Sequence, residues 1–248
     1  FIPANILQKH SALTEEEFEI MKTHTTLGYK ICMDDIKLRP YAAGTIYHHE
    51  ALNGSGYPNG LTKDDIPYEG QIIRVADEYD AIVSKRQYKS HIGIIDTLKI
   101  LVDETKPIPN SDAIKILASE TKPEHNPSEN VKIPTLGKNN PIIVKALIKV
   151  IIDDTEYEIS CIMDYLKDLK TEIKRLEQIE KYDKKRISAN SEDKKNYYLD
   201  GMKCLLTGQE TVDNYLEILN SYKNIVQSKT EHIDKLFEEI KIVKKLKF

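Results

Sequence analysis

Apolar residues recur at helical spacing along most of the chain, and no alternating strand pattern persists beyond a few residues. Near the start, Thr14 followed by Glu17 has the spacing of a capping box, which predicts a helix that carries His24 and runs toward Cys32. The apolar residues expected to share a buried side of this helix are Phe18, Met21 and Ile31. The pattern predicts an all-α fold.

Two further helices are predicted on either side of a glycine-rich segment. Proline suits a first helical turn, so one helix is expected from Pro40 to His49. The segment 53–60 reads Asn-Gly-Ser-Gly-Tyr-Pro-Asn-Gly, which consists of turn-forming residues and predicts a loop. A second helix is expected from about Tyr68 to Ser84, and the residues spaced for one face of it are Ile72, Val75, Ala76 and Tyr79.

A short repeat follows. Residues 96–107 recur in similar form at 112–123, each copy ending in Glu-Thr-Lys-Pro. Two copies are too few for a solenoid, so we interpret them as a duplicated helix on the flank of the domain. Residues 124–140 are polar and contain proline and glycine, which predicts a loop before another helix that begins at Pro141.

The character of the chain changes near Asp153. All ten prolines precede this point, and the remainder is more highly charged, which predicts long helices. We therefore expect one domain at 1–153 and a charged helical appendage at 154–248. Two stripes have heptad spacing there: Ile159, Ile162, Leu166, Leu169, Ile173 and Leu176, and then Leu219, Tyr222, Val226, Lys229, Ile233, Leu236, Ile240 and Val243. They predict a helical hairpin, with a polar connection at 183–195, or a dimerising coiled coil.

Charge and composition narrow the function classes. The net charge of the 248 residues is −4, so no basic field favours DNA or RNA. No run of about 18 apolar residues occurs, so no membrane span is expected in this chain. Cys32, Cys161 and Cys204 are odd in number and lack metal-ligand spacing, which indicates reduced thiols and a cytoplasmic location.

Two adjacent histidines are candidates for chemistry. His48 and His49 directly precede the glycine-rich loop, and neighbouring helical residues point about 100° apart. The pair can therefore reach two metal ions, or one metal ion and a phosphate. Alone, such a pair is more typical of a helix end or surface.

Paired charges on the helix after the loop are a second candidate. Asp77 and Asp80 lie three residues apart among apolar neighbours, where a carboxylate needs a partner, a hydrogen bond or a metal. Arg86 and Lys89 follow at the same spacing. They could hold an anionic ligand or simply complement the helix C-terminus.

Taken together, these motifs resemble the HD-GYP family of metallohydrolases. The stretch His48-His49-Glu50, the tripeptide Gly56-Tyr57-Pro58 and the sequence Val75-Ala76-Asp77 carry the resemblance, which extends from Phe1 to about residue 151. It implies hydrolysis of cyclic di-GMP to the linear dinucleotide or GMP. It also implies two or more divalent transition metals as cofactors, of which Fe or Mn suits imidazole and carboxylate ligands best.

The resemblance also implies roles for individual residues. The metal ligands by position are His24, His48, His49 and Asp77. The residues that fall on substrate contacts are Gly56, Tyr57, Pro58, Arg86 and Lys89, the last two holding phosphate and guanine. Asp80 has no matching ligand role and is interpreted as structural.

One element of the family pattern is missing. The His-Asp pair and the lysine after it do not occur in the sequence, and we expect them to lie upstream of Phe1 in a longer protein. On this interpretation the 248 residues alone have little or no activity. The alternative is a non-catalytic cyclic-dinucleotide-binding signalling module. A third hypothesis makes the tail a dimerising or partner-binding arm. The partners expected for the protein are a second copy or an upstream sensor or receiver domain.

Overall fold

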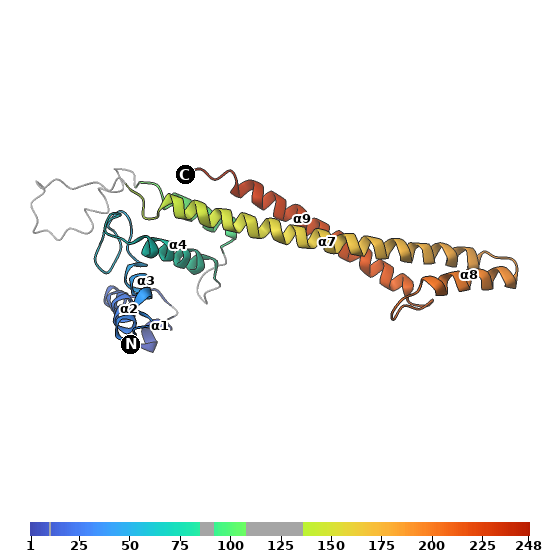
Figure 1. Cartoon of the computed structure of the whole chain (residues 1–248), viewed down its shortest axis with the longest axis horizontal. Helices are drawn as coiled ribbons and strands as arrows, with labels where there is room; N and C mark the ends of the chain where they lie inside the picture. The colour runs from blue at the N-terminus through green and yellow to red at the C-terminus, as the bar shows by residue number, and fades with distance from the viewer. Residues whose placement is uncertain (10, 85–91, 108–135) are drawn as a thin grey trace, which may run out of the picture. The chain divides into compact units, whose positions relative to one another are not determined.

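The computed structural model describes residues 1–9, 11–84, 92–107 and 136–248, and Figure 1 shows the chain. Within these residues the structure is helical, with one isolated antiparallel bridge between Asn53 and Thr62. The predicted all-α class is confirmed. The chain divides into two compact units, residues 1–151 with 242–248, and residues 152–241. Among the described helices, none has the length and apolar character that a bilayer crossing needs.

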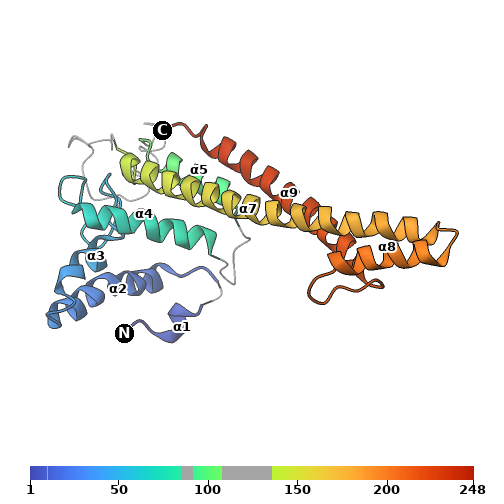
Figure 2. The same ribbon diagram turned by 45° about the vertical axis from the view of Figure 1, so that its right-hand side comes forward.

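The first unit contains several short helices that pack on one another in sequence order. The elements in chain order are α1 (Ala4–Leu7), α2 (Glu15–Asp34), the 3-10 helix η1 (Arg39–Tyr41), α3 (Ala42–Tyr47), α4 (Tyr68–Val83) and α5 (Ile94–Asp103). Helix α3 packs against both α2 and α4, and α4 packs against α5, as Figure 2 shows. The end of α3 therefore lies where residues of α2 and α4 can meet.

The predicted capping box opens α2. The hydroxyl of Thr14 accepts a hydrogen bond from the amide of Glu17, and the Glu17 carboxylate accepts one from the amide of Thr14. The prediction of the buried side was wrong, because Phe18 and Ile31 are 43 % and 45 % exposed. The face of α2 that packs on its neighbours instead buries Thr25 and Cys32.

The next two helices depart from expectation in different ways. The predicted helix 40–49 is a 3-10 turn followed by a short α-helix that ends at Tyr47, so His48 lies at its C-terminal cap. Helix α4 has nearly the predicted bounds. Its predicted face was only partly correct, since Val75 is buried whereas Ile72 and Ala76 are exposed. The first repeat copy includes most of α5, and the second copy lies outside the described residues, as does most of the predicted loop 124–140.

Long antiparallel helices pack together in the second unit. Helix α7 (Pro141–Ile187) starts at the predicted proline, and α9 (Tyr215–Val243) carries the second stripe. Two apolar clusters join the stripes: Ile159 and Leu166 with Ile233, Leu236 and Ile240, and Leu176 and Ile179 with Met202, Tyr215 and Leu219. The two stripes thus pack on each other within one chain, as in a hairpin.

The connection between the stripes is more ordered than its polarity suggests. Residues 183–195 were expected to be a solvated link, but α7 continues to Ile187 and α8 (Glu192–Leu205) begins soon afterwards. Met202 of α8 is fully buried in the second cluster, so α8 packs against the two stripes. Arg175 of α7 secures the segment after α8, because its guanidinium donates to the Leu205 carbonyl and to both carboxylate oxygens of Glu210, each at 2.6 Å.

Candidate metal centre and adjoining pocket

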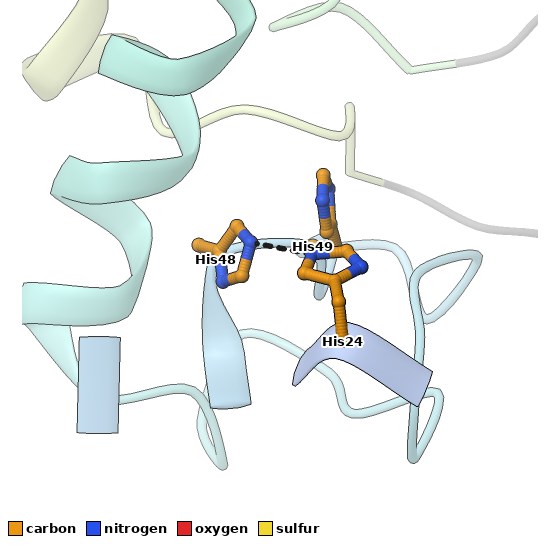
Figure 3. Close-up of side chains that lie close together, drawn as sticks. All are labelled: His24, His48 and His49. Atoms are coloured by element: carbon orange, nitrogen blue, oxygen red, sulfur yellow. Dashed lines mark hydrogen bonds between the residues drawn. The ribbon is translucent and has the colours of Figure 1, made fainter. Parts of the chain in front are cut away.

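Three histidines from two helices meet in the first unit. His24 lies in the middle of α2, and His48 and His49 follow the end of α3. One ring nitrogen from each lies within 4.8 Å of the others, which makes this a group that could hold a metal ion. Figure 3 shows the three side chains, with the contact between the Nε2 atoms of His24 and His48 at 3.1 Å drawn as a dashed line.

Backbone carbonyls determine which nitrogens carry protons. Nδ1 of His24 lies 2.7 Å from the carbonyl of Met21, and Nδ1 of His48 lies 3.1 Å from the carbonyl of Gly44. A carbonyl only accepts, so we assign the N–H of each neutral ring to Nδ1. Both Nε2 lone pairs then point into the same space. Two lone pairs at 3.1 Å repel unless a proton or a cation lies between them, so the donor arrangement fits a divalent metal.

Burial keeps the His48 and His49 imidazoles in the form that binds metal. Burial and the neighbouring His24 lower the pKa of His48, although the charge of Asp77 opposes the change. Burial, His48, His24 and Arg74 lower the pKa of His49 to about 3. A metal ligand must be deprotonated, and these rings are neutral at neutral pH.

Asp77 lies near the histidine group but is not part of it. The described group within 4.8 Å contains the three imidazoles, and Asp77 is an exposed residue of α4. Its charge nevertheless acts on His48, and burial together with the Asp77 charge raises the pKa of Tyr57 to about 12. The Tyr57 phenol therefore keeps its proton. The structure thus brings Asp77 to the edge of the site.

The glycine-rich loop is folded directly onto the histidines. The Tyr57 ring stacks on His49 with centroids 4.6 Å apart, and its amide donates to the His49 carbonyl at 3.1 Å. Gly56 makes this approach possible, because a Cβ there would lie 2.3 Å from the amide nitrogen of Ala51. Both oxygens of the buried Glu50 accept loop amides, from Asn59 at 2.7 Å and Leu61 at 2.8 Å.

A cavity of about 260 Å³ adjoins the histidine group. Its aromatic wall includes Phe18 and Tyr57, whose rings meet edge to face at 5.9 Å. Three cations also line it, Lys22 from α2, Arg74 from α4 and Lys138 from the segment before α7. The pocket therefore combines aromatic surface and positive charge next to His49.

Some residues of this site were predicted from the sequence. His24, His48, His49 and Tyr57 come together as a group, whereas Arg86 and Lys89 lie outside the described residues. Asp80 accepts a hydrogen bond from the Ser84 hydroxyl at 3.0 Å, at the end of α4. The residues that sequence reasoning did not assign are Phe18, Lys22, Glu50, Arg74 and Lys138. The role of Glu50 could have been predicted, because a carboxylate directly before a loop can accept hydrogen bonds from the loop amides.

The first unit is thus an all-α domain with a histidine group that could hold a metal ion, and comparison with known proteins adds a family to this description. A family model described as "HD domain" matches residues 1–108. The chain is 50 % identical over 91 residues to a "Cyclic di-GMP phosphodiesterase" of Thermotoga maritima, which covers 36 % of this chain and 25 % of that protein.

Two other relatives give similar coverage. The chain is 41 % identical over 103 residues to "Cyclic di-GMP phosphodiesterase PdeB" of Borreliella burgdorferi, covering 40 % of this chain and 27 % of that protein. It is 42 % identical over 90 residues to "3'3'-cGAMP-specific phosphodiesterase 2" of Vibrio cholerae, covering 36 % and 17 %. The N-terminal part of the chain matches the HD domain family model, and the HD-GYP resemblance is confirmed. The chain spans about a quarter of the length of these relatives or less.

Proposed function

We propose that this chain supplies part of the active site of a metal-dependent phosphodiesterase that hydrolyses a cyclic dinucleotide, with cyclic di-GMP as the first candidate. The observation that carries the proposal is the convergence of the His24 and His48 Nε2 lone pairs beside a pocket with aromatic and cationic walls. The names of the relatives support the substrate class, and one of them extends it to 3'3'-cGAMP.

The cofactor in this proposal is a set of two or more divalent transition metals. His24, His48 and His49 would hold them, with the Asp77 carboxylate as a further ligand. Imidazole and carboxylate donors without thiolate favour Fe or Mn over a structural zinc site. When bound, such ions activate water and neutralise charge on a phosphate.

The chain's own residues position the substrate in this proposal. Tyr57 offers a rigid ring beside the metal ligands, held by its stacking on His49, and its phenol donates a hydrogen bond at neutral pH. Gly56 and Pro58 set the path of the backbone on either side. Arg86 and Lys89 are proposed as phosphate and guanine contacts on the strength of the motif alone.

The helical region is proposed to have a separate role. Residues 1–153 would form the catalytic domain and 154–248 an appendage through which a second copy or a sensor domain is contacted. The apolar stripes are already paired within the chain, so such a contact would use the outer faces of the helices. The three cysteines are free, which supports a reducing, cytoplasmic location.

A non-catalytic binding module is the second candidate. It is favoured by one observation, the pocket beside His49, whose aromatic and cationic side chains could bind a nucleotide without any chemical step. Such a module would retain Tyr57 and the adjoining pocket and would bind a cyclic dinucleotide without cleaving it.

The test measures turnover and binding with the protein at its natural length. After anaerobic loading with Fe²⁺ or Mn²⁺, cyclic di-GMP and 3'3'-cGAMP are offered separately, and products are resolved by chromatography. We expect linear dinucleotide or GMP from the wild type and none from His48→Ala. His232→Ala is the matched control, because His232 lies on α9 and pairs with Glu158. Binding without turnover would establish the second candidate, and neither binding nor turnover would contradict both.

A further inference from the structure

One cation of the pocket has no carboxylate partner within the described ranges. Lys22 pairs with Glu19 at 2.6 Å, and Lys138 pairs with Glu104 at 3.0 Å. Arg74 forms no such pair there, and its described partners are neutral. Of these three cations, Arg74 is therefore the one without an ion pair among the described residues.

Neutral groups fix the Arg74 side chain in place. Its Nε donates to the Oδ1 of the buried Asn139 at 2.9 Å, and Asn139 is itself held by Glu78, which accepts from its amide at 2.7 Å. One terminal nitrogen lies 3.4 Å from the His49 carbonyl, which is long for a hydrogen bond. The other terminal nitrogen has no partner among the described residues. A half-buried guanidinium is thus held rigidly while keeping donors to spare.

The position of Arg74 relates it to the metal centre. It lies one helical turn before Asp77 on α4, so the two side chains share a face. Arg74 contacts the backbone of His49 and lines the same cavity as the His49 and Tyr57 side chains. An anion bound to Arg74 would therefore lie beside the histidine group.

The size and walls of the cavity indicate what kind of anion fits. Pockets that enclose drug-sized ligands have about 300–1,000 Å³, so a cavity of about 260 Å³ suits one nucleotide unit rather than a whole dinucleotide. A guanidinium fork matches two oxygens of a phosphate. Phe18 and Tyr57 provide the aromatic surface that a nucleobase needs.

We propose that Arg74 is a substrate-binding residue, and that its pocket takes the phosphate of one nucleotide unit while Phe18 and Tyr57 contact the base. The proposal rests on the proposed function for its choice of ligand class, but it concerns a residue that the motif does not assign. It separates phosphate binding at Arg74 from metal binding at the histidines. Loss of Arg74 should weaken the ligand and leave the metal in place.

GMP is the probe, because it contains one phosphate and one base and does not need to be cleaved. Its Kd is measured by calorimetry on the metal-loaded protein at natural length. For Arg74→Gln we expect the Kd to rise about tenfold or more, with unchanged metal content by elemental analysis. Arg74→Lys keeps the charge but loses the two-pronged guanidinium, so its Kd for GMP should lie between those of the wild type and Arg74→Gln. Arg39→Gln is the matched control, since Arg39 also donates through Nε to a neutral acceptor, the Met33 carbonyl, but does not line the pocket.

A second measurement covers the case in which Arg74→Gln does not fold. Arginine Nε–H signals are recorded by NMR in the wild type, with the Arg74 signal assigned from its absence in Arg74→Lys. GMP should shift the Arg74 signal and leave the Arg39 signal unchanged. Unchanged GMP affinity in a folded Arg74→Gln protein, or an unshifted Arg74 signal, would overturn the proposal. Arg74-dependent GMP binding in a protein that cleaves no cyclic dinucleotide would instead refute the proposed function alone.

Discussion

The carboxylate of Glu50 accepts a hydrogen bond from the backbone amide of Asn59 at 2.7 Å, across nine residues of the glycine-rich loop. Its second oxygen accepts the amide of Leu61, so one buried side chain closes the loop from within. Glu50 follows His49 directly. The residue after a candidate metal ligand thus determines the path of the loop that carries Tyr57.

Replacing this acceptor should loosen the loop. Glu50→Gln leaves one loop amide facing an NH₂ group, and a buried donor without a partner costs about 1–3 kcal/mol. We expect urea unfolding to show a loss of stability in that range and hydrogen exchange at Asn59 and Leu61 to accelerate. Glu69→Gln, an exposed change in the first turn of α4, is the control. Equal exchange rates in both variants would show that Glu50 does not hold the loop.

Metal affinity should distinguish two aspartates on one helix. Asp77 acts electrostatically on His48, whereas Asp80 accepts from Ser84 at the helix end. Asp77→Ala should raise the metal Kd by at least the roughly 10–100-fold that loss of an outer-shell partner costs. Asp80→Ala should leave it unchanged. Chelator competition measures both, and equal effects of the two changes would contradict a ligand role for Asp77.

The ion pair between Arg175 and Glu210 should make the second unit sensitive to acid. Hydrogen bonds from Arg175 lower the pKa of Glu210 below its ordinary value of 4.5. A carboxyl group with a lowered folded-state pKa contributes stability above its unfolded-state pKa, and this contribution is lost as the pH falls through the folded-state value.

Glu210→Gln should therefore be less stable than the wild type at pH 7, by about 1.5–3 kcal/mol. The difference should shrink below pH 4.5 and vanish in stronger acid. Thermal unfolding followed by circular dichroism at several pH values checks this expectation. A difference that stays constant down to pH 2 would mean that the pair is not the source.

Packing at the centre of the second unit should be the most sensitive to truncation. Leu176 is fully buried in the cluster that joins α7, α8 and α9. Leu176→Ala should cost about 2–5 kcal/mol, since it removes buried methyl groups and leaves a cavity. The same change at Leu216, which is 44 % exposed, should cost much less. Comparable losses at the two sites would show that the stripes do not pack as described.

Local signals in the sequence were reliable because their physics is local. The Thr14 capping box needs partners only three residues apart, and the heptad stripes of α7 and α9 repeat often enough to determine their own pairing. Buried faces were predicted less well. Phe18 is apolar, yet it lines a pocket beside Tyr57, which depends on a loop some forty residues later in the chain.

The candidate site shows the same division. The histidines were found because the motif keeps them in a recognisable order, even though His24 lies 24 residues from His48. Arg74 was not assigned, because its significance depends on Asn139, which lies 65 residues further along the chain. An arginine inside an amphipathic helix looks like a solvated residue until the partner that immobilises it is known.

The absence of a side chain at Gly56 couples the positions of two functional groups, His49 and Tyr57. With the loop backbone pressed against residues 49–51, any larger residue at position 56 would displace the carbonyl of His49 to which Tyr57 is bonded. A substitution at position 56 therefore cannot move the Tyr57 ring without also moving His49, a candidate metal ligand. Phe18 and Lys22 also line the pocket but lie on α2, so they can change without disturbing the loop. Substitutions in α2 are therefore the route by which evolution or protein engineering would change the selectivity of this pocket, while the sequence of the loop stays constant.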